Sequence, residues 1–464
     1  MRLSDGVLEQ HGEALNLPDA SCILPLQSGG CVVLPLESAL QSIPPSSFAA
    51  PDRRLRIAII GHACSPGEGS EPGFTWNWAK SLAQHHDVTA FIFPHPVYRP
   101  RIDSFAWDVP PEQRPKFVLV QLAALDPWKP LDGEKHLRVH YGLWQRQVLQ
   151  SLIAEHRHKP FDVAHHVSWG SLNQPPLIWK AGIPFVWGPI GGGQTWPAAF
   201  YRYAPRNGLT ERLRAAVVFL SRFNPAIRRA VKHSDLILAK NRETADALGA
   251  IGATRVITYF DGGISPDVLS PRTTPSTAGP ITLLWAGRHE PRKGLPLVLE
   301  AMVKVARDVR LLIAGDGPST GRWKSLAQTL GLSSRVEFLG RVPWTRMQEL
   351  YATADAFLFT SLRDATGTVV LEAMAKSIPI IAFDHQGVGC YLSDETAVKI
   401  PVTTPPQTID ALAAAIDRLA ADPTERDRLG RAGYAKAAEE LWSLRAEKMV
   451  AWYRQAIAAH FPDK

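Results

Sequence analysis

Residues 356–383 read "AFLFTSLRDATGTVVLEAMAKSIPIIAF", and this stretch decides the fold. The apolar runs at its two ends are typical of buried parallel strands, which lack polar alternation. Between them, "TVVLEAMA" is typical of a helix, and "LRDATG" has the small and polar residues of a loop. A strand, a loop, a helix and a second strand in this order predict one β-α-β unit of an α/β domain.

The same alternation of strand-like and helical segments occurs in two series along the chain. Residues 262–280 are rich in Pro, Gly, Ser and Thr, lack periodicity and separate the two series. We therefore predict an α/β fold with two Rossmann-like doubly wound domains that face each other across a cleft, where such folds bind ligands. The predicted strands are LRIAII, DVTAFIF, FDVAHHVS, IPFVWGPIGGG and SDLILAKN in the first series and ITLLWAG, VRLLIAGDG, VEFLG, AFLFTS and IPIIAF in the second.

Four parts of the chain follow from this pattern. Residues 1–53 form an N-terminal appendage and linker with a small hairpin, and residues 54–265 form the first domain. The second domain covers residues 275–440. The last part, residues 441–464, is an amphipathic helix that can pack back on the first domain.

Composition limits the classes of function. The chain has 464 residues with 51 Lys and Arg against 44 Asp and Glu, and its net charge of +7 favours an anionic ligand or surface. No dense Lys and Arg run predicts a nucleic-acid partner. The four cysteines lack CxxC spacing, which argues against zinc and favours buried thiols in a reducing compartment. With no signal-like start and no run of about 20 apolar residues, we expect a cytoplasmic protein.

Charged residues follow two predicted strands of the second domain. Arg288, Arg292 and Lys293 come directly after ITLLWAG and suit an anion, although a solvated basic loop has the same composition. Asp364 lies in the loop after AFLFTS, before a helix start near Thr368 whose backbone N–H groups suit a phosphate.

Glu372 is unusual because it lies inside an apolar helical run. It is four residues after Thr368, hence on the same face of the helix and about 6 Å further along its axis. A carboxylate there can accept hydrogen bonds from both hydroxyls of a ribose. The alternative is structural: Glu372 pairs with Lys376 on an exposed face, and Asp364 closes a turn.

Four blocks of the second domain resemble, in order and spacing, those of the retaining nucleotide-sugar glycosyltransferases with the B-type fold (GT-B), family four of the usual classification (glycosyltransferase group 1). The resemblance is closest over residues 281–400, looser over 55–260 and absent over 1–53. The blocks are AGRHEPRKGLPLVLEAM, LLIAGDGP, VEFLGRV and SLRDATGTVVLEAMAKSIPII.

The resemblance implies roles for residues of the second domain. Arg288 and Lys293 would hold the donor diphosphate, Gly367 and Thr368 would give it backbone N–H groups, and Glu372 would bind the ribose. Asp364 takes the place of the family's first glutamate, which contacts the transferred sugar, and it is one methylene shorter.

In the first domain, the resemblance extends to two segments. Gly67 and Gly69 belong to a loop similar to the one that faces donor and acceptor, and they are the expected positions of close approach. The strand FDVAHH resembles the one whose histidine touches the sugar. His165 and His166 are adjacent, whereas the family places its histidines two apart, so both are candidates. "GPIGGG", 188–193, either lines the cleft or forms a turn.

The implied activity is transfer of a sugar from a nucleotide-diphosphate donor to a saccharide or lipid-linked saccharide, with retention, in cell-surface or exopolysaccharide synthesis. It would need no metal and no cofactor besides the donor. The alternatives are a nucleotide-sugar epimerase of the same fold and a non-catalytic nucleotide-sugar-binding protein.

Residues 209–232 combine cations with apolar residues, which suits either an anionic membrane surface at the inner face of the membrane or ordinary surface helices.

Overall fold

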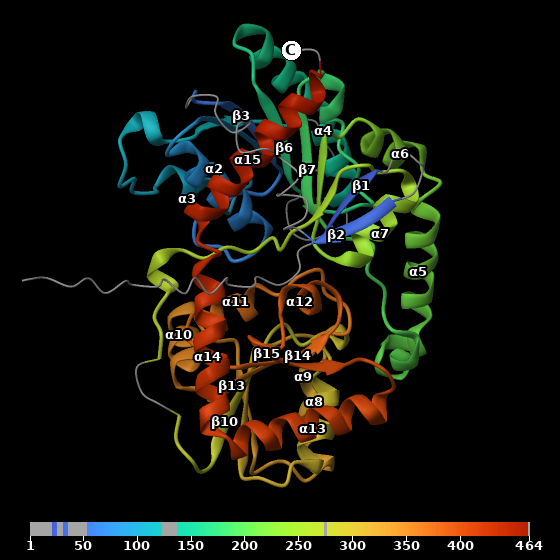
Figure 1. Cartoon of the computed structure of the whole chain (residues 1–464), viewed down its shortest axis with the longest axis vertical. Coiled ribbons are helices and arrows are strands. Elements are labelled where there is room, and N and C mark those ends of the chain that lie inside the picture. Colours follow the sequence, from blue (N-terminus) through green and yellow to red (C-terminus); the bar gives the residue numbers. More distant parts are fainter. Residues whose placement is uncertain (1–20, 26–30, 36–52, 123–136, 273–275, 463–464) are drawn as a thin grey trace, which may run out of the picture.

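The computed structural model of the chain describes residues 21–25, 31–35, 53–122, 137–272 and 276–462. These residues form two lobes that lie one above the other along the long axis (Figure 1). Each lobe is built around one open sheet with helices packed on its faces, which confirms the predicted α/β fold with two Rossmann-like domains.

The first sheet has the order β2-β1-β9-β8-β7-β6-β3-β4-β5. Strands β3 to β9 pair in parallel, and the β1–β2 hairpin is antiparallel and joins the β9 edge through Cys22 and Ile257. The strands are β1 Ser21–Pro25, β2 Cys31–Pro35, β3 Arg56–Gly61, β4 Asp87–Ile92, β5 Lys116–Leu119, β6 Val163–Ser168, β7 Phe185–Ile190, β8 Leu236–Ala239 and β9 Val256–Thr258.

The second sheet has the order β12-β11-β10-β13-β14-β15, and all its strands are parallel. Five of them are the predicted ones, and β15 is a sixth that the sequence analysis did not include because a lysine interrupts its short apolar run. The strands are β10 Ile281–Ala286, β11 Val309–Ala314, β12 Val336–Gly340, β13 Ala356–Phe359, β14 Ile380–Asp384 and β15 Ala397–Pro401.

Helices connect the strands and cover the sheets. In the part of the chain that the structure describes, no helix is both long and apolar enough to cross a membrane. The helices are α2 Glu71–Ala83, α3 Arg99–Asp103, α4 Leu137–His158, α5 Leu209–Ser221, α6 Pro225–Lys232, α7 Arg242–Ile251, α8 Leu295–Lys304, α9 Thr320–Thr329, α10 Trp344–Thr353, α11 Thr368–Met374, α12 Gln386–Tyr391, α13 Pro405–Ala421, α14 Pro423–Ala438 and α15 Trp442–His460.

Each sheet reverses its strand order once. The reversal lies between β3 and β6 in the first sheet and between β10 and β13 in the second. At such a reversal the chain leaves two neighbouring strands in opposite directions, which opens a crevice at their carboxyl ends. The loops at these crevices are therefore 62–70 and 169–171 in the first domain and 287–294 and 360–367 in the second.

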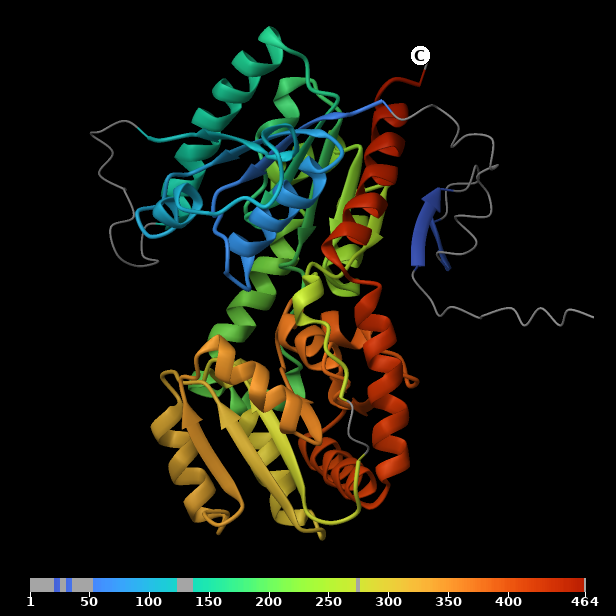
Figure 2. The ribbon, with the colours of Figure 1, turned by 90° about the vertical axis from the view of Figure 1, so that its left-hand side faces the viewer.

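The segment directly before α5 comes from the first domain in sequence but packs on the second domain in space. Trp196, Phe200 and Ala204 are buried in the hydrophobic core of the second domain, and the Tyr203 hydroxyl donates to Glu300 Oε2 on α8 at 2.8 Å. Helix α5 then runs back toward the first lobe (Figure 2). This corrects the single boundary drawn after residue 265, because in space this segment belongs with the second lobe.

After β9 the chain passes into the second lobe at residues 259–264, here called the first crossing, and it returns to the first lobe just before α15, the second crossing. This helix packs along α2 of the first domain, where the rings of Trp442 and Trp78 meet edge to face at 5.3 Å. The two crossings lie side by side, since Ile264 and Leu441 form a β-bridge.

Arg445 is buried where the two crossings meet. Its guanidinium pairs with Glu440, donates to the carbonyl of Phe260 and lies 4.2 Å from the ring centroid of Tyr259. One side chain thus joins α15 to the residues on both crossings.

We predict that Arg445→Leu lowers the free energy of unfolding by about 3–5 kcal/mol, because it leaves the carboxylate of Glu440 half-buried without its cation. Urea-induced unfolding followed by tryptophan fluorescence measures the change. Lys448→Leu, on the exposed face of the same helix, is the control and should change stability by less than about 0.5 kcal/mol. Equal stability of the two variants would contradict the role of Arg445.

Candidate active site between the two domains

The loops after β10 and β13 meet because these strands are neighbours. Lys293 Nζ forms an ion pair with Asp364 Oδ2, and Arg292 Nη1 lies 3.3 Å from the same oxygen. The Ser361 hydroxyl also contacts this oxygen, at 3.3 Å. The structure therefore brings two of the predicted site residues, Lys293 and Asp364, into direct contact.

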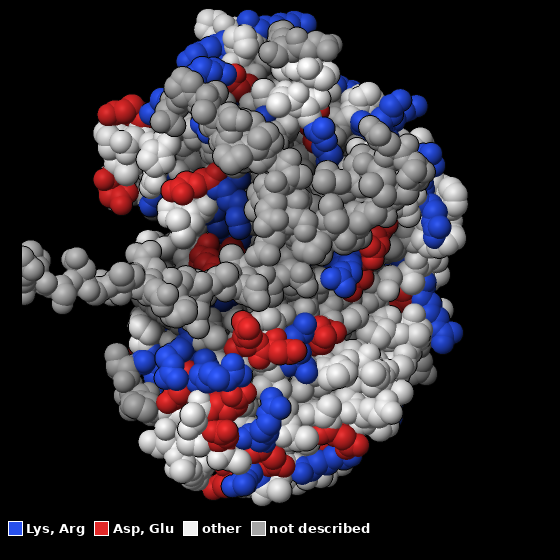
Figure 3. Space-filling model, in the orientation of Figure 1, with Lys and Arg blue, Asp and Glu red and all other residues white. Residues whose placement is uncertain are grey.

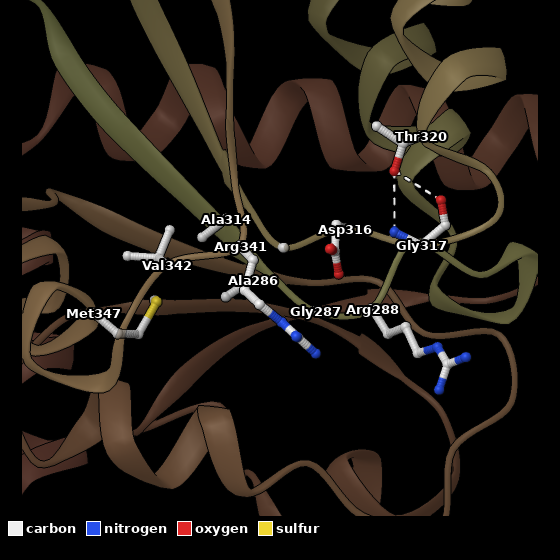
Figure 4. A pocket seen from close by; sticks show the side chains of 11 residues that line it. Ala286, Gly287, Arg288, Ala314, Asp316, Gly317, Thr320, Arg341, Val342 and Met347 are labelled. Atoms are coloured by element: carbon white, nitrogen blue, oxygen red, sulfur yellow. Dashed lines mark hydrogen bonds between the residues drawn. The ribbon is translucent and has the colours of Figure 1, made fainter. Parts of the chain in front are cut away.

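Arg288 lies apart from this pair, with its side chain 65% exposed and its Nε 3.0 Å from Glu290 Oε1. It lines a cavity of about 690 Å³ at the carboxyl ends of β10, β11 and β12 (Figure 4). Arg288 and Arg341 extend toward the same side of this cavity, and Asp316 lies between them. Gly315 has φ +129°, and a Cβ there would lie 2.0 Å from the carbonyl oxygen of Gly287, so only glycine lets these loops approach.

Glu372 lies on α11, where the Tyr351 hydroxyl donates to its Oε2 at 3.2 Å. Tyr351 follows Met347, a cavity residue, by one turn of α10. Burial raises the pKa of Glu372 to about 7. The alternative pairing with Lys376 is not formed; the negative charge that acts on Lys376 is that of Asp267.

Gly367 and Thr368 begin α11. A Cβ at Gly367 would lie 2.7 Å from the Phe359 ring, so no larger residue fits between the strand and the helix. The methyl group of Thr368 packs against Gly262 on the first crossing between the lobes. The start of α11 is thus held between its own sheet and the first domain.

His165 and His166 do not face the cleft, which corrects their prediction as catalytic residues. Both are fully buried within β6. His165 contacts the Tyr453 hydroxyl at 2.6 Å and the carbonyl of Gly188 at 2.7 Å, while His166 contacts the Tyr141 hydroxyl at 2.7 Å. Burial lowers the pKa of His165 to about 4 and that of His166 to about 3, so both are neutral packing residues.

The predicted glycine loop follows β3. Gly67 and Gly69 are exposed, and a Cβ at either would meet nothing within 4 Å, so the space beside both is open. The close approach that shapes this loop is at Gly73, where a Cβ would lie 1.8 Å from the carbonyl oxygen of Glu68.

Of the four cysteines, Cys64 in this loop is buried as expected. Cys390 is exposed, which corrects the expectation of a buried thiol at that position.

The segment GPIGGG lines the interface between the domains. A Cβ at Gly191 would lie 3.0 Å from the Cβ of Ala365, next to Asp364. Nearby, Gln386 Nε2 donates to the carbonyl of Thr195 at 2.7 Å and Gln386 Oε1 accepts from the backbone N–H of Asp364 at 2.7 Å. Sequence reasoning missed Gln386, although the unusual HQGVGC segment was a signal for it.

Sequence reasoning also missed a charged cluster opposite the Asp364 loop, which we call the Lys240 cluster: Glu71, Lys240 and Asp261. Lys240 Nζ lies 2.6 Å from Asp261 Oδ2 and 3.8 Å from Glu71 Oε1. Burial opposes the charge of Lys240, but Asp261 and Glu71 outweigh it and raise the pKa of the lysine. Glu71 lies in the predicted glycine loop and Lys240 at the end of the predicted strand SDLILAKN, whereas Asp261 follows β9, which the sequence analysis did not predict.

Charged residues of both signs are visible where the surface is indented between the lobes (Figure 3). The second domain contributes a cavity lined by Arg288 and Arg341, and the ion pair of Lys293 with Asp364. The first domain contributes the Lys240 cluster and the loops of its own crevice. This arrangement suits an anionic ligand that also carries hydroxyl groups.

Residues 270–436 match the family described as glycosyl transferases group 1. Alpha-D-kanosaminyltransferase of Streptomyces kanamyceticus is 28% identical over 177 residues, 37% of this chain and 45% of the relative. The lipopolysaccharide core biosynthesis glycosyltransferase LpsE of Rhizobium meliloti is 27% identical over 207 residues, 44% of this chain and 59% of the relative. The chain thus spans about half the length of the curated relatives it matches.

Solved structures resemble the chain over more of its length. Sucrose-phosphate synthase of Thermosynechococcus elongatus matches with a TM-score of 0.61 and 20% identity, over 88% of this chain and 100% of that one. HepE of Anabaena, solved in complex with UDP and glucose, matches with a TM-score of 0.56 and 15% identity, over 87% and 100%. Residues 270–436 thus match the glycosyl transferases group 1 family, in a chain whose two-domain fold is that of the B-type glycosyltransferases.

Proposed function

We propose that the chain transfers a sugar from a nucleoside diphosphate donor to a hydroxyl group of a saccharide or lipid-linked saccharide, with retention, in cell-surface or exopolysaccharide synthesis. The observation that carries this proposal is the contact of Lys293 with Asp364 at the strand reversal of the second sheet, beside the cavity that Arg288 lines. The family match and the UDP and glucose bound to HepE support the same donor class.

The donor would lie along the carboxyl edge of the second sheet. The nucleoside would occupy the cavity, with its ribose hydroxyls donating to Glu372. Arg288 and Lys293 would hold the diphosphate, and Gly367 and Thr368 would contribute backbone N–H groups. The sugar would then reach Asp364, at the end of the site nearest to the first domain.

The reaction would break the bond between the anomeric carbon and the diphosphate oxygen and form a bond to the acceptor oxygen on the same face. The acceptor's proton would pass to the departing diphosphate. Arg288 and Lys293 would stabilise the negative charge that develops on this leaving group. In this proposal the two cations supply the charge that a divalent ion supplies in other transferases, so no metal or cofactor is required.

We predict that Glu372→Gln weakens nucleotide binding and removes its pH dependence. The pKa of Glu372 is about 7, so the wild-type carboxylate becomes protonated below that pH and loses acceptors for the ribose. Wild-type affinity for UDP, GDP or ADP should fall by up to about tenfold per pH unit below pH 7. Isothermal titration with the nucleotide that raises the melting temperature most measures this, with Glu349→Gln, an exposed carboxylate on α10, as control. Unchanged affinity in Glu372→Gln would remove the ribose assignment.

We also predict that Asp364→Ala lowers kcat by about hundredfold while nucleotide affinity changes little, since Asp364 would act on the sugar during transfer. Steady-state transfer in the presence of EDTA measures both quantities. Asp364→Glu restores the family's residue and should recover part of the activity, and Asp410→Ala, an exposed carboxylate on α13, should have no effect. A kcat unchanged in Asp364→Ala would exclude this role.

Donor hydrolysis without acceptor separates the alternatives. A transferase should release the sugar slowly to water, whereas a non-catalytic binding protein would leave the donor intact. An epimerase would change the sugar's configuration. We favour transfer because residues 270–436 match the family described as glycosyl transferases group 1.

Helix α5 supports a lipid-linked acceptor. Leu209, Leu213, Val217 and Leu220 lie on one face of this helix, and all are more than half exposed, as is Phe223 just beyond it. Six cations lie on α5, directly after it and on α6: Arg212, Arg214, Arg222, Arg228, Arg229 and Lys232. An exposed apolar face in a segment this rich in cations suits an anionic lipid surface.

We expect the chain to sediment with vesicles that contain phosphatidylglycerol and not with vesicles of phosphatidylcholine alone. Leu213→Ser combined with Leu220→Ser should abolish sedimentation because it removes the apolar contact. Leu444→Ser, an exposed leucine on α15, is the matched control. Equal binding to both kinds of vesicle would count against an electrostatic membrane contact.

A further inference from the structure

A second cavity, of about 490 Å³, lies between α2 and α15 in the first domain. We call it the α2–α15 cavity: it is lined by residues 81–86 at the carboxyl end of α2, by one face of α15 within residues 443–454, and by Arg53. Arg53 leads into β3 and His86 directly precedes β4, so the cavity lies at the amino ends of these strands. The crevice of the first sheet lies at the opposite edge, where α2 begins.

The distance between the two edges separates this cavity from the cleft. Helix α2 has 13 residues, which span about 20 Å at 1.5 Å per residue. A small ligand in the α2–α15 cavity therefore does not occupy the cleft between the domains.

The cavity has an apolar floor and a polar rim. The side chains of Leu82, Ala446 and Val450 line it and are buried, whereas Glu447 and Arg454 line it from exposed positions. An apolar surface that carries a few polar groups, in a cavity of this volume, is typical of a site for a small molecule.

Arg454 supplies an unpaired positive charge at this rim. Arg53 pairs with Asp162 at 2.6 Å, but Arg454 forms no hydrogen bond or ion pair with any residue in the described part of the chain. Burial and the charge of Arg454 lower the pKa of His86 to about 4. His86 is therefore neutral at pH 7 and lies close enough to Arg454 to feel its charge.

His86 offers a hydrogen-bond donor beside this cation. Its Nδ1 accepts from the backbone N–H of Leu55 at 3.2 Å, so the proton of the neutral ring is on Nε2. The carbonyl of Leu82, near the end of α2, already accepts from the backbone N–H groups of His85 and His86. These bonds reduce the repulsion that the end of a helix exerts on an anion.

Glu447 and Arg454 define the two ends of the site. They are seven residues apart on the face of α15 that lines the cavity, about 10 Å along the helix axis. A phosphate suits the end with Arg454, while the carboxylate of Glu447 repels anions and accepts from hydroxyl groups. A hexose phosphate has both groups, and the C–H groups of its ring suit the apolar floor.

We propose that the α2–α15 cavity is a second ligand site, which binds a hexose phosphate. The phosphate accepts from Arg454 and from His86 Nε2, and hydroxyl groups of the sugar donate to Glu447. No residue of the cleft takes part, so this binding is independent of the proposed transfer.

Isothermal titration of the full chain tests this site. The probes are the 6-phosphates of glucose, galactose and mannose, together with inorganic phosphate and glucose. Wild type should bind at least one hexose 6-phosphate about tenfold more tightly than either inorganic phosphate or glucose, because both ends of the site then contribute. Equal affinity for inorganic phosphate and all three hexose phosphates would overturn the proposal, as would failure of all three to bind.

Variants of exposed residues locate the binding without disturbing the core. Arg454→Gln should weaken binding of the hexose 6-phosphate by about tenfold or more, because it removes a charge-assisted hydrogen bond. Glu447→Leu should reduce the advantage of the hexose phosphate over inorganic phosphate, whose own affinity should not fall. Lys448→Gln, an exposed cation on α15 that does not line the cavity, is the matched control and should bind as wild type does.

Arg288→Gln distinguishes this site from the cavity of the second domain. It should leave hexose phosphate binding unchanged, since Arg288 lies in the other lobe. Loss of binding in Arg288→Gln together with full binding in Arg454→Gln would place the phosphate in the second domain and overturn the proposal. The proposed function is tested separately by UDP, GDP and ADP, and its failure would leave these titrations as they are.

Discussion

The single reversal of strand order in each sheet is the constraint from which the rest of the site follows. Two parallel sheets with right-handed crossovers must each open a crevice where the order reverses. Here the two crevices face each other, as the hydrogen bond from Asn241 to Ala365 shows. Lys293 and Asp364 meet at one crevice and Glu71 and Gly170 at the other, although each pair is far apart in sequence. The strand order alone therefore brings these charged and polar residues together.

The relative position of the sheets depends on polar groups buried at the interface. Arg445 ties the two crossings together, and the ion pair of Glu211 with Arg363, at 2.9 Å, fixes the start of α5 to the loop of the second domain that carries Asp364. Buried pairs of this kind contribute less to net stability than to a defined geometry, because desolvation offsets much of their attraction. Their effect is to hold Asp364 and the Lys240 cluster at one separation.

The sequence predicted the second domain well, since its strands are near-continuous apolar runs and its charged residues follow them directly. It could not show that His165 and His166 point away from the cleft. All residues of their strand are buried, so the sequence pattern does not reveal which other elements pack on each side chain. Tyr453 and Tyr141, which cover them, come from distant helices. It also missed Lys240 and Asp261, which meet because β8 and β9 are neighbours in the first sheet, and Gln386, which joins Asp364 to the distant Thr195. Residues fixed by local pattern are thus predictable, and residues fixed by long-range contact are not.

The loop that carries Asp364 is held from two sides. Asn241 of the first lobe donates to the carbonyl of Ala365. Gln386 joins Asp364 to Thr195, and Glu211 pairs with Arg363, but Thr195 and the start of α5 lie with the second lobe. Separation of the lobes would therefore break the contact of Asn241 and leave those of Gln386 and Glu211 in place. Opening would expose the crevice while Gln386 still holds the backbone of Asp364, so the position of this carboxylate depends on the segment before α5 that packs into the second lobe.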